Sequence, residues 1–149
     1  MTTASASRTK LTPNIADIIG LARAVKRGGG DGIVAINTVR GMAIDIELKK
    51  PVLYNRMGGY SGSAIKPIGV RAVYAICKEV EIPIIGCGGI ATGADALEYI
   101  MAGASAVQIG TGVYTRGIDV FANVSSEISD YMKSHGISEI HELVGMAIK

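Results

Sequence analysis

The sequence predicts an α/β fold in which parallel strands alternate with helices, and three observations lead to it. Short apolar runs that are typical of strands alternate with longer amphipathic segments in the order βαβαβα. The strand-like runs are continuously apolar, as in parallel strands that are buried on both faces. The stretches GDGIVAINT (30–38) and GASAVQIGT (103–111) share the pattern Gly–x–x–apolar–Val–x–Ile–x–Thr. This internal repeat favours units of a (β/α)₈ barrel over a Rossmann sheet, and no GxGxxG motif follows any strand.

The first third of the chain contains one predicted helix and one predicted strand. Residues 1–9 are small and polar, and we expect them to be disordered or an atypical start. A helix is expected over 15–27, where apolar residues recur at helical spacing, with Asn14 as its N-cap. A buried strand is expected over 32–37. The irregular segment 38–63 contains DIELKKPVLYN, which indicates a small hairpin.

The rest of the chain alternates helices and strands. A further helix is expected within 138–149 at the end of the chain. The other expected elements are a helix over 64–80, a strand over 82–87, a helix over 93–103, a strand over 106–110 and a helix over 118–136.

The composition excludes several classes of function. The net charge is +2 and only 5% of residues are aromatic, without interleaved Lys or Arg, so nucleic-acid binding is disfavoured. The two cysteines form no CxxC motif, so neither a zinc site nor a disulfide framework is expected. No apolar stretch is long enough to span a membrane, and the start has no secretory signal. These features predict a cytoplasmic protein in a reducing compartment.

Two glycine turns, Gly88-Gly89 and Gly110-Thr111, each follow a strand-like run, one βα unit apart. In a parallel barrel, the loops after the last two strands commonly hold a phosphate group. Glycine lets backbone N–H groups approach an anion without a Cβ in the way, and a helix N-terminus adds partial positive charge. The pair favours a phosphate-bearing ligand, and the alternative is that these glycines only form tight turns.

Five motifs carry a resemblance to a known family. KLTPN (10–14), INT (36–38), SGSAIKP (61–67), GCGGI (86–90) and VQIGT (107–111) occur in this order. Their spacing resembles the C-terminal half of class 1 dihydroorotate dehydrogenase, the soluble FMN enzyme of pyrimidine synthesis. The resemblance extends from Lys10 to about Lys149. It implies the C-terminal half of a (β/α)₈ TIM barrel with parallel strands.

The resemblance implies roles for nine residues. In the family, a hydride passes from dihydroorotate to FMN while a base on the enzyme removes a proton. A cation beside the flavin ring stabilises negative charge on the reduced cofactor. The expected FMN contacts are Lys10, Ile36 through its backbone, Gly62 and, at the phosphate, Gly88, Gly89, Gly110 and Thr111, and the expected pyrimidine contacts are Asn37 and Thr38.

Each role has a plainer alternative. Lys10 is otherwise a solvated lysine, and Asn37 a residue that caps a turn. Cys87 is expected to pack as a small apolar residue rather than to act as a nucleophile. We expect His135 and His141 to be exposed.

A full barrel needs roughly 250 residues, so this chain supplies about four βα units, strands five to eight in family terms. The family's catalytic base, a cysteine, lies in the other half, so the catalytic residue stays unknown. The stretch ASASRT before Lys10 is a poor buried strand, so the first strand is expected to be absent or badly formed. Such a half-barrel has unpaired edges at the fifth and eighth strand positions, and open edges favour association.

Three interpretations stay open: a fragment of a dehydrogenase, one half of a split enzyme, or a half-barrel that binds a phosphate ligand without redox chemistry. Outside the family, the alternative is another FMN- or sugar-phosphate-binding barrel. The expected partners are dihydroorotate or orotate, and either a second copy or a missing N-terminal half-barrel. The SG-x-AIKP form favours the NAD-linked branch, in which an FAD and iron–sulfur subunit passes electrons to NAD. The other class 1 branch reduces fumarate, and the motif disfavours the membrane-bound class 2.

Overall fold

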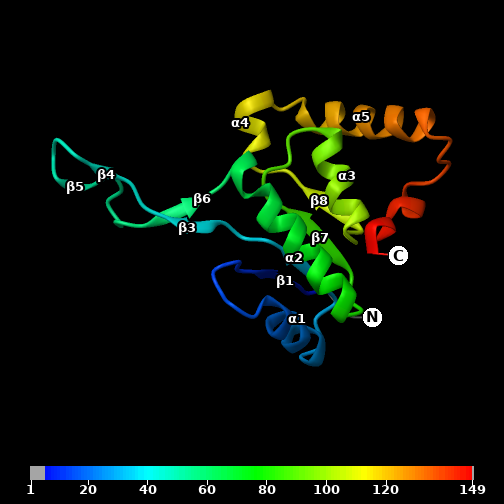
Figure 1. Ribbon diagram of the computed structural model, residues 1–149, viewed down its shortest axis with the longest axis horizontal. Coiled ribbons are helices and arrows are strands. Elements are labelled where there is room, and N and C mark those ends of the chain that lie inside the picture. Colours follow the sequence, from blue (N-terminus) through cyan, green and yellow to red (C-terminus); the bar gives the residue numbers. More distant parts are fainter. Residues whose placement is uncertain (1–5, 149) are drawn as a thin grey trace, which may run out of the picture.

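A computed structural model describes residues 6–148, and its centre is a parallel sheet of four strands (Figure 1). All neighbouring strands of this sheet run in the same direction. The order across the sheet is β1 (Arg8–Leu11), β2 (Gly32–Ala35), β7 (Ile84–Cys87) and β8 (Ala106–Gln108). Strands that are neighbours in the sheet therefore follow one another along the chain, as in a sector of a barrel.

The helices between these strands pack on one another in chain order. Helix α1 contacts α2, α2 contacts α3, and α3 contacts α5, so they form one continuous layer on the sheet (Figure 1). Their bounds are α1 Ile18–Arg27, α2 Lys66–Glu79, α3 Gly93–Met101, α4 Gly112–Arg116 and α5 Val120–Ser134. A doubly wound sheet carries helices on both faces, whereas one helical layer is consistent with part of a (β/α)₈ barrel. The predicted α/β fold is confirmed.

Strand register divides the sheet residues between two faces. Leu11, Ala35 and Gly86 are aligned across β1, β2 and β7, and all three are buried against the helical layer. Because side chains alternate along a strand, Lys10 and Ile85 point to the opposite face. That second face carries no helix and is the inner face of the barrel sector.

The hydrophobic core lies between the sheet and helix α2. Ile33 of β2, Ile84 of β7, and Val73 and Ile76 of α2 are each no more than 1% exposed. All four residues of β2 are buried, whereas three of the four residues of β1 and two of the three in β8 are exposed. The prediction that the strands are buried on both faces is therefore right for β2 and wrong for the edge strands, which lack a neighbour on one side.

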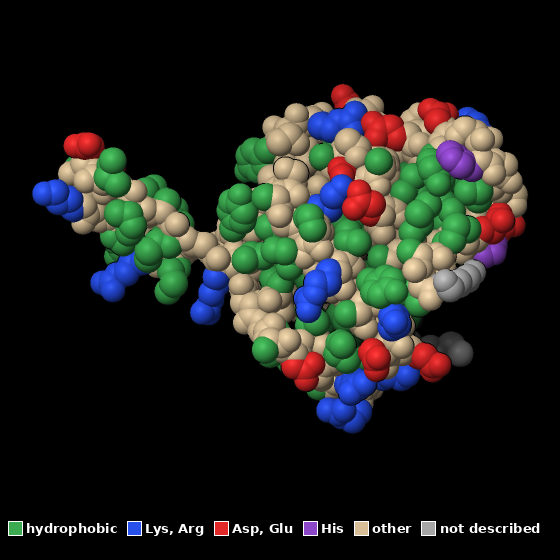
Figure 2. All heavy atoms as spheres, viewed as in Figure 1, with side chains coloured by type: hydrophobic (Ala, Val, Ile, Leu, Met, Phe, Trp, Pro, Cys, Tyr) green, Lys and Arg blue, Asp and Glu red, His purple; other side chains and the backbone are tan. Residues whose placement is uncertain are grey.

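An antiparallel arm projects from the carboxyl end of β2 (Figure 1). Two strand pairs form it: β3 (Val39–Gly41) with β6 (Gly58–Tyr60), and β4 (Ile44–Asp45) with β5 (Lys50–Pro51). The second pair confirms the predicted hairpin. Apolar side chains gather on the arm (Figure 2), and those that are at least half exposed are Met42, Ile44, Ile46, Leu48, Val52, Tyr54, Met57 and Tyr60.

The first strand contradicts the expectation that it is absent or badly formed. Strand β1 pairs with β2 from Arg8 to Leu11, and the Asp31 carboxylate accepts a hydrogen bond from the Ser7 N–H at 2.8 Å. An edge strand with one partner is held by its backbone bonds and needs few apolar side chains, and here only Leu11 is buried. Part of the expectation for residues 1–9 concerns residues 1–5, which lie outside the described residues.

Two local predictions about helices are wrong. Asp17, not Asn14, caps α1, and it accepts the Gly20 N–H at 2.7 Å. The Asn14 side chain instead donates to the Thr38 carbonyl and accepts the Arg40 N–H, so it ties the start of the arm to the strand ends. The segment expected to form a last helix contains two 3₁₀ turns, η2 (Ile140–Leu143) and η3 (Met146–Ile148). Gly145 lies between these turns with φ of 71°, which interrupts a helix.

Two short elements were not predicted from the sequence, namely α4 and the 3₁₀ turn η1 (Ser63–Ile65) that leads into α2. Both lie in loops that follow strand ends. Within residues 6–148, no helix combines the length and apolarity needed to cross a bilayer.

We predict that the chain self-associates, because the outer edges of β1 and β8 leave backbone donors and acceptors without a strand partner. Sedimentation velocity at micromolar concentration should give species larger than a monomer. The variant Ile46→Lys tests the arm, since Ile46 is 78% exposed there. Association should persist in this variant, whereas a compact monomer of the unmodified chain would contradict the prediction.

Candidate functional site

The predicted site residues converge on one cavity at the carboxyl ends of the strands. Its volume is about 190 Å³, and the ends of all four strands of the sheet and the loop before α2 contribute to its walls. Gly62 is the one predicted residue that does not line it. The lining residues are Lys10, Ile36, Asn37, Thr38, Ser61, Ile65, Cys87, Gly88, Gly89, Gly110 and Thr111.

Three loops meet at the floor of this cavity. A Cβ on Gly89 would lie 2.7 Å from the Gly62 carbonyl oxygen, so the two backbones are in direct contact. The Thr111 hydroxyl donates to the Ser61 hydroxyl at 3.0 Å, and this bond joins the loop after β8 to the loop before α2. Gly62 therefore lies behind the cavity wall rather than in it, with φ of 92°. Only glycine adopts such a conformation at little cost.

Tyr99 of α3 holds the Gly88-Gly89 turn from the side of the helical layer. Both glycines have positive φ, 133° and 72°. The Tyr99 hydroxyl donates to the Gly88 carbonyl at 2.7 Å, and its side chain is fully buried. Burial raises the pKa of Tyr99 well above its ordinary range, so the hydroxyl stays protonated and acts as a donor.

The start of α3 does not offer its N–H groups to a ligand. The Asp95 carboxylate accepts the Ala91 and Thr92 N–H groups at 3.0 and 2.9 Å, and Thr92 caps the helix in return. Glu127 of α5 accepts the Gly93 N–H. Protein carboxylates thus already accept the N–H groups of Ala91, Thr92 and Gly93, so these donors do not support the expectation that the start of α3 adds to an anion site.

A salt-bridge cluster fixes this helix start to α2. Lys66 donates to Asp95 at 2.8 Å and also pairs with Glu98. Burial acts to raise the pKa of Asp95, but hydrogen bonds from Lys66 and from the two backbone amides lower it below its ordinary value. Hydrogen bonds to both carboxylates raise the pKa of Lys66. Lys66 and Asp95 are thus charged at neutral pH, and Lys66 serves the fold rather than the cavity.

The Gly110-Thr111 turn is built differently from the Gly88-Gly89 turn. A Cβ on Gly110 would meet no atom within 4 Å, so this glycine leaves the backbone open on its cavity side. Helix α4 follows at once and has no side-chain cap. A Cβ on Gly112 would lie 2.6 Å from the Ile90 carbonyl oxygen, which shows how closely the two turns approach.

Asn37 and Thr38 leave β2 at the cavity rim. The Asn37 side-chain oxygen accepts the N–H of Thr38 at 2.8 Å. This bond orients the amide and leaves its NH₂ group as a donor. The Asn37 N–H donates to the Leu11 carbonyl at 2.8 Å, so the rim is also tied to β1.

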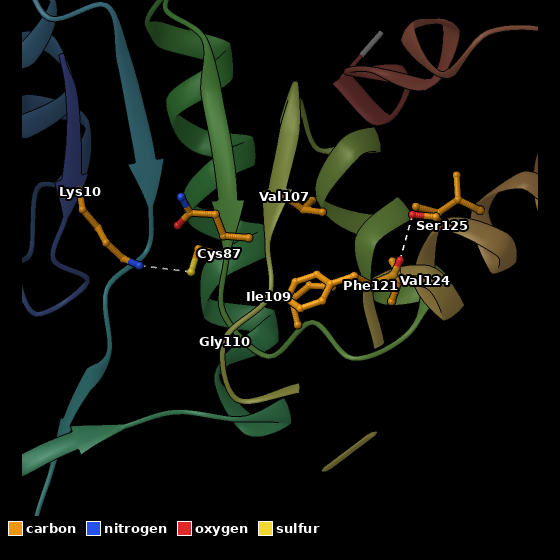
Figure 3. A pocket seen from close by; sticks show the side chains of 10 residues that line it. Lys10, Cys87, Val107, Ile109, Gly110, Phe121, Val124 and Ser125 are labelled. Carbon is orange, nitrogen blue, oxygen red and sulfur yellow. Dashed lines mark hydrogen bonds between the residues drawn. The ribbon is translucent and has the colours of Figure 1, made fainter. Parts of the chain in front are cut away.

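Lys10 and Cys87 meet on the inner face of the sheet. The Lys10 ammonium donates to the Cys87 sulfur at 3.3 Å, as Figure 3 shows. Both side chains also line a larger cavity of about 520 Å³ beside β8 and α5, where Phe121 and Val124 form an apolar wall. Cys87 was expected only to pack as an apolar residue, and its thiol instead faces these cavities and a cation. The described residues contain no cluster of three or more His, Cys, Asp or Glu side chains able to hold a metal ion.

Fold and site together define a class. A sector of parallel α/β barrel carries, at its strand ends, two glycine turns, a lysine and an asparagine amide around one cavity. Backbone N–H groups and a lysine are suited to an anion, and an oriented amide is suited to a planar polar ligand. The class is a parallel α/β fold, consistent with part of a barrel, whose strand ends surround one cavity with glycine turns, a lysine and an asparagine amide.

Comparisons with known proteins identify the family. The dihydroorotate dehydrogenase family profile matches residues 4–132, and the chain belongs to this family. A relative from Methanocaldococcus jannaschii is 58% identical over 138 residues, 93% of this chain and 45% of the relative. Relatives from Pyrococcus horikoshii and Thermoplasma acidophilum are 54% and 53% identical over 140 residues, 94% of this chain and 46% of each relative. All three are named dihydroorotate dehydrogenase B (NAD(+)), catalytic subunit.

The chain thus spans a little under half the length of the curated relatives that it matches. The family predicted from the five motifs is confirmed, and the alternative of an unrelated phosphate-binding barrel is wrong. Sequence reasoning missed Tyr99, the Lys10–Cys87 contact and the carboxylates that close the start of α3. For the carboxylates at the start of α3, the capping pattern Thr92-x-x-Asp95 was the one local signal in the sequence.

We predict unequal effects on the free energy of unfolding for alanine at the two turns. Gly89→Ala places a Cβ against Gly62 and Lys66 at positive φ and should cost about 1–3 kcal/mol of unfolding free energy. Gly110→Ala meets no neighbour and should stay within about 0.5 kcal/mol of the unmodified chain. Urea denaturation of the two variants measures both values, and equal losses would contradict the described turn geometry.

Proposed function

We propose that this chain is the FMN-phosphate- and orotate-binding half of a dihydroorotate dehydrogenase, which oxidises dihydroorotate to orotate in pyrimidine synthesis. The observation that carries the proposal is the single cavity that gathers the motif residues from KLTPN, INT, GCGGI and VQIGT. Family membership supports the reaction. The names of the relatives, which include NAD(+) and the words catalytic subunit, support the NAD-linked branch and a second subunit. We propose that this subunit carries FAD and an iron–sulfur cluster.

The residues present fit FMN on structural grounds. A Cβ on Gly110 would stand in open space, and Gly88 and Gly89 line the cavity without side chains, at the positive φ that glycine adopts readily. These turns and Thr111 would hold the phosphate, while Lys10 and the Ile36 backbone would lie beside the ring. When bound, FMN supplies the acceptor for the hydride.

The substrate side of the site rests on Asn37 and Thr38. Their amide and hydroxyl groups would bind the pyrimidine edge and orient it, because Asn37 is already fixed by its bond to the Thr38 N–H. The Lys10 ammonium would balance negative charge in the site. The base that removes the proton is proposed to come from the other half of the barrel, since relatives are about twice as long as this chain.

The length of the relatives, about twice that of this chain, also supports a partner that completes the barrel. A cavity of about 190 Å³ is smaller than the roughly 300–1,000 Å³ typical of ligand pockets, so further walls are needed to enclose a flavin. The open edges of β1 and β8 are where such walls would join. Cys77 and Cys87 are both free thiols, which supports a reducing compartment such as the cytoplasm.

Complementation tests the proposal. We predict that co-expression with the N-terminal half of the Methanocaldococcus jannaschii relative gives a complex that retains FMN and oxidises dihydroorotate with an artificial electron acceptor. The chain alone should show no turnover. Flavin retention without turnover in the complex would favour a non-catalytic half-barrel, and turnover by the chain alone would place the base within it.

We predict that Asn37→Ala in that complex weakens orotate binding far more than FMN binding. Asn37 is exposed in the chain alone, and loss of its amide, once the bound pyrimidine edge covers it, should cost roughly 1–3 kcal/mol. Titration of each ligand by flavin fluorescence gives both affinities, and Asn123→Ala on the exposed side of α5 is the matched control. Equal losses for the two ligands would mean that Asn37 only shapes the loop.

A further inference from the structure

Tyr99 lies in a slot that three glycines make possible. A Cβ on Gly69 of α2 would fall 1.9 Å from the Tyr99 hydroxyl, and one on Gly86 of β7 would fall 2.5 Å from its ring. A Cβ on Gly88 would lie 3.2 Å from the same hydroxyl. The ring thus passes from the helical layer to the end of β7, and no side chain on these residues could share the space.

The hydroxyl bonds most closely to one peptide unit, and its second acceptor, the Lys66 carbonyl, lies farther away at 3.5 Å. The Gly88 carbonyl points toward Tyr99, at 2.7 Å from the hydroxyl oxygen. In a planar trans peptide the carbonyl and the following N–H point in opposite directions. The Gly89 N–H is therefore directed away from Tyr99 and out of the helical layer, on the side where Gly88 and Gly89 line the cavity.

Among the described residues, Tyr99 makes the one hydrogen bond to this peptide, and the packing of Gly89 against Gly62 is its other restraint. Both flanking residues are glycines, which cross between positive and negative φ with little steric penalty. A rotation of the plane would turn the carbonyl oxygen toward the cavity, where it would repel an anion. Tyr99 is 0% exposed, so if the Gly88 carbonyl turns away the hydroxyl keeps only the Lys66 carbonyl, at 3.5 Å, as an acceptor, and losing the much closer 2.7 Å bond is costly.

We propose that Tyr99 is a positioning residue for ligand phosphate, since its hydroxyl holds the Gly88–Gly89 peptide with the N–H directed into the cavity. This inference rests on the proposed function, in which that turn binds the phosphate of FMN. Tyr99 does not line the cavity and acts only through the backbone that it holds.

The test compares two flavins that differ only in the phosphate. FMN and riboflavin are each titrated into the unmodified complex with the N-terminal half, into its Tyr99→Phe variant and into its Tyr131→Phe variant. Tyr131 is a partly buried tyrosine of α5 that stacks on His135, so it controls for loss of a hydroxyl away from the turn. Tyr99→Phe should reduce the preference for FMN over riboflavin by roughly three- to tenfold, the worth of one hydrogen bond. Riboflavin affinity should change less than about twofold.

Hydrogen–deuterium exchange of the chain without flavin gives a second, ligand-free readout. Tyr99→Phe should speed exchange in 86–92 while 106–112 and the helical layer keep their rates, and Tyr131→Phe should leave 86–92 unchanged. An unaltered FMN preference together with unaltered exchange in 86–92 would overturn the inference, as would equal losses for both flavins. If the unmodified complex itself shows no FMN preference, the proposed phosphate site fails, and exchange in 86–92 alone then decides the role of Tyr99.

Discussion

The arrangement of the site depends on one hydrogen bond, from the buried Tyr99 hydroxyl to the Gly88 carbonyl. It links the helical layer to the end of β7 and lies under the cavity, and it requires glycine at 69, 86 and 88. A tyrosine in this position combines a large apolar ring, which fills the space between α2 and β7, with one polar atom that must find an acceptor. The core packing and the shape of the loop are thus set by the same side chain.

Salt bridges between the helices also hold the elements around the glycine turns in place. Lys66, Asp95 and Glu98 join α2 to α3, and Arg116 with Glu127 joins the loop after β8 to α5. Glu127 is hydrogen-bonded by the Gly93 N–H and by Arg116, which lower its pKa. These carboxylates occupy the start of α3, so the donors that stay free for a ligand are those of the glycine turns. An anion in the cavity would be bound by loop backbone rather than by that helix.

The inner face of the sheet, opposite the helical layer, is left uncovered in this chain. β2 has a strand on each side and is fully buried, whereas β1 and β8 have one neighbouring strand each and are largely exposed. Lys10 and Cys87 lie on the inner face, where further strands of a barrel would enclose them. The apolar wall beside β8 and the exposed side chains of the arm are left in contact with solvent in the isolated chain. Apolar area in water costs about 25 cal/mol per Å², so both surfaces favour a partner.

The sequence by itself determined the alternation of strands and helices, the hairpin, the glycine turns and the family. These follow from apolar periodicity, from the backbone freedom of glycine and from short motifs, all of which are local. Only the tertiary structure decided that Tyr99 holds Gly88, that Lys10 meets Cys87 and that Asn14 ties the arm rather than caps a helix. These contacts join residues 11, 77 and 24 positions apart, so no local pattern records them. The first strand was misjudged for the same reason, because its partner β2, not its own side chains, supplies the bonds that form it.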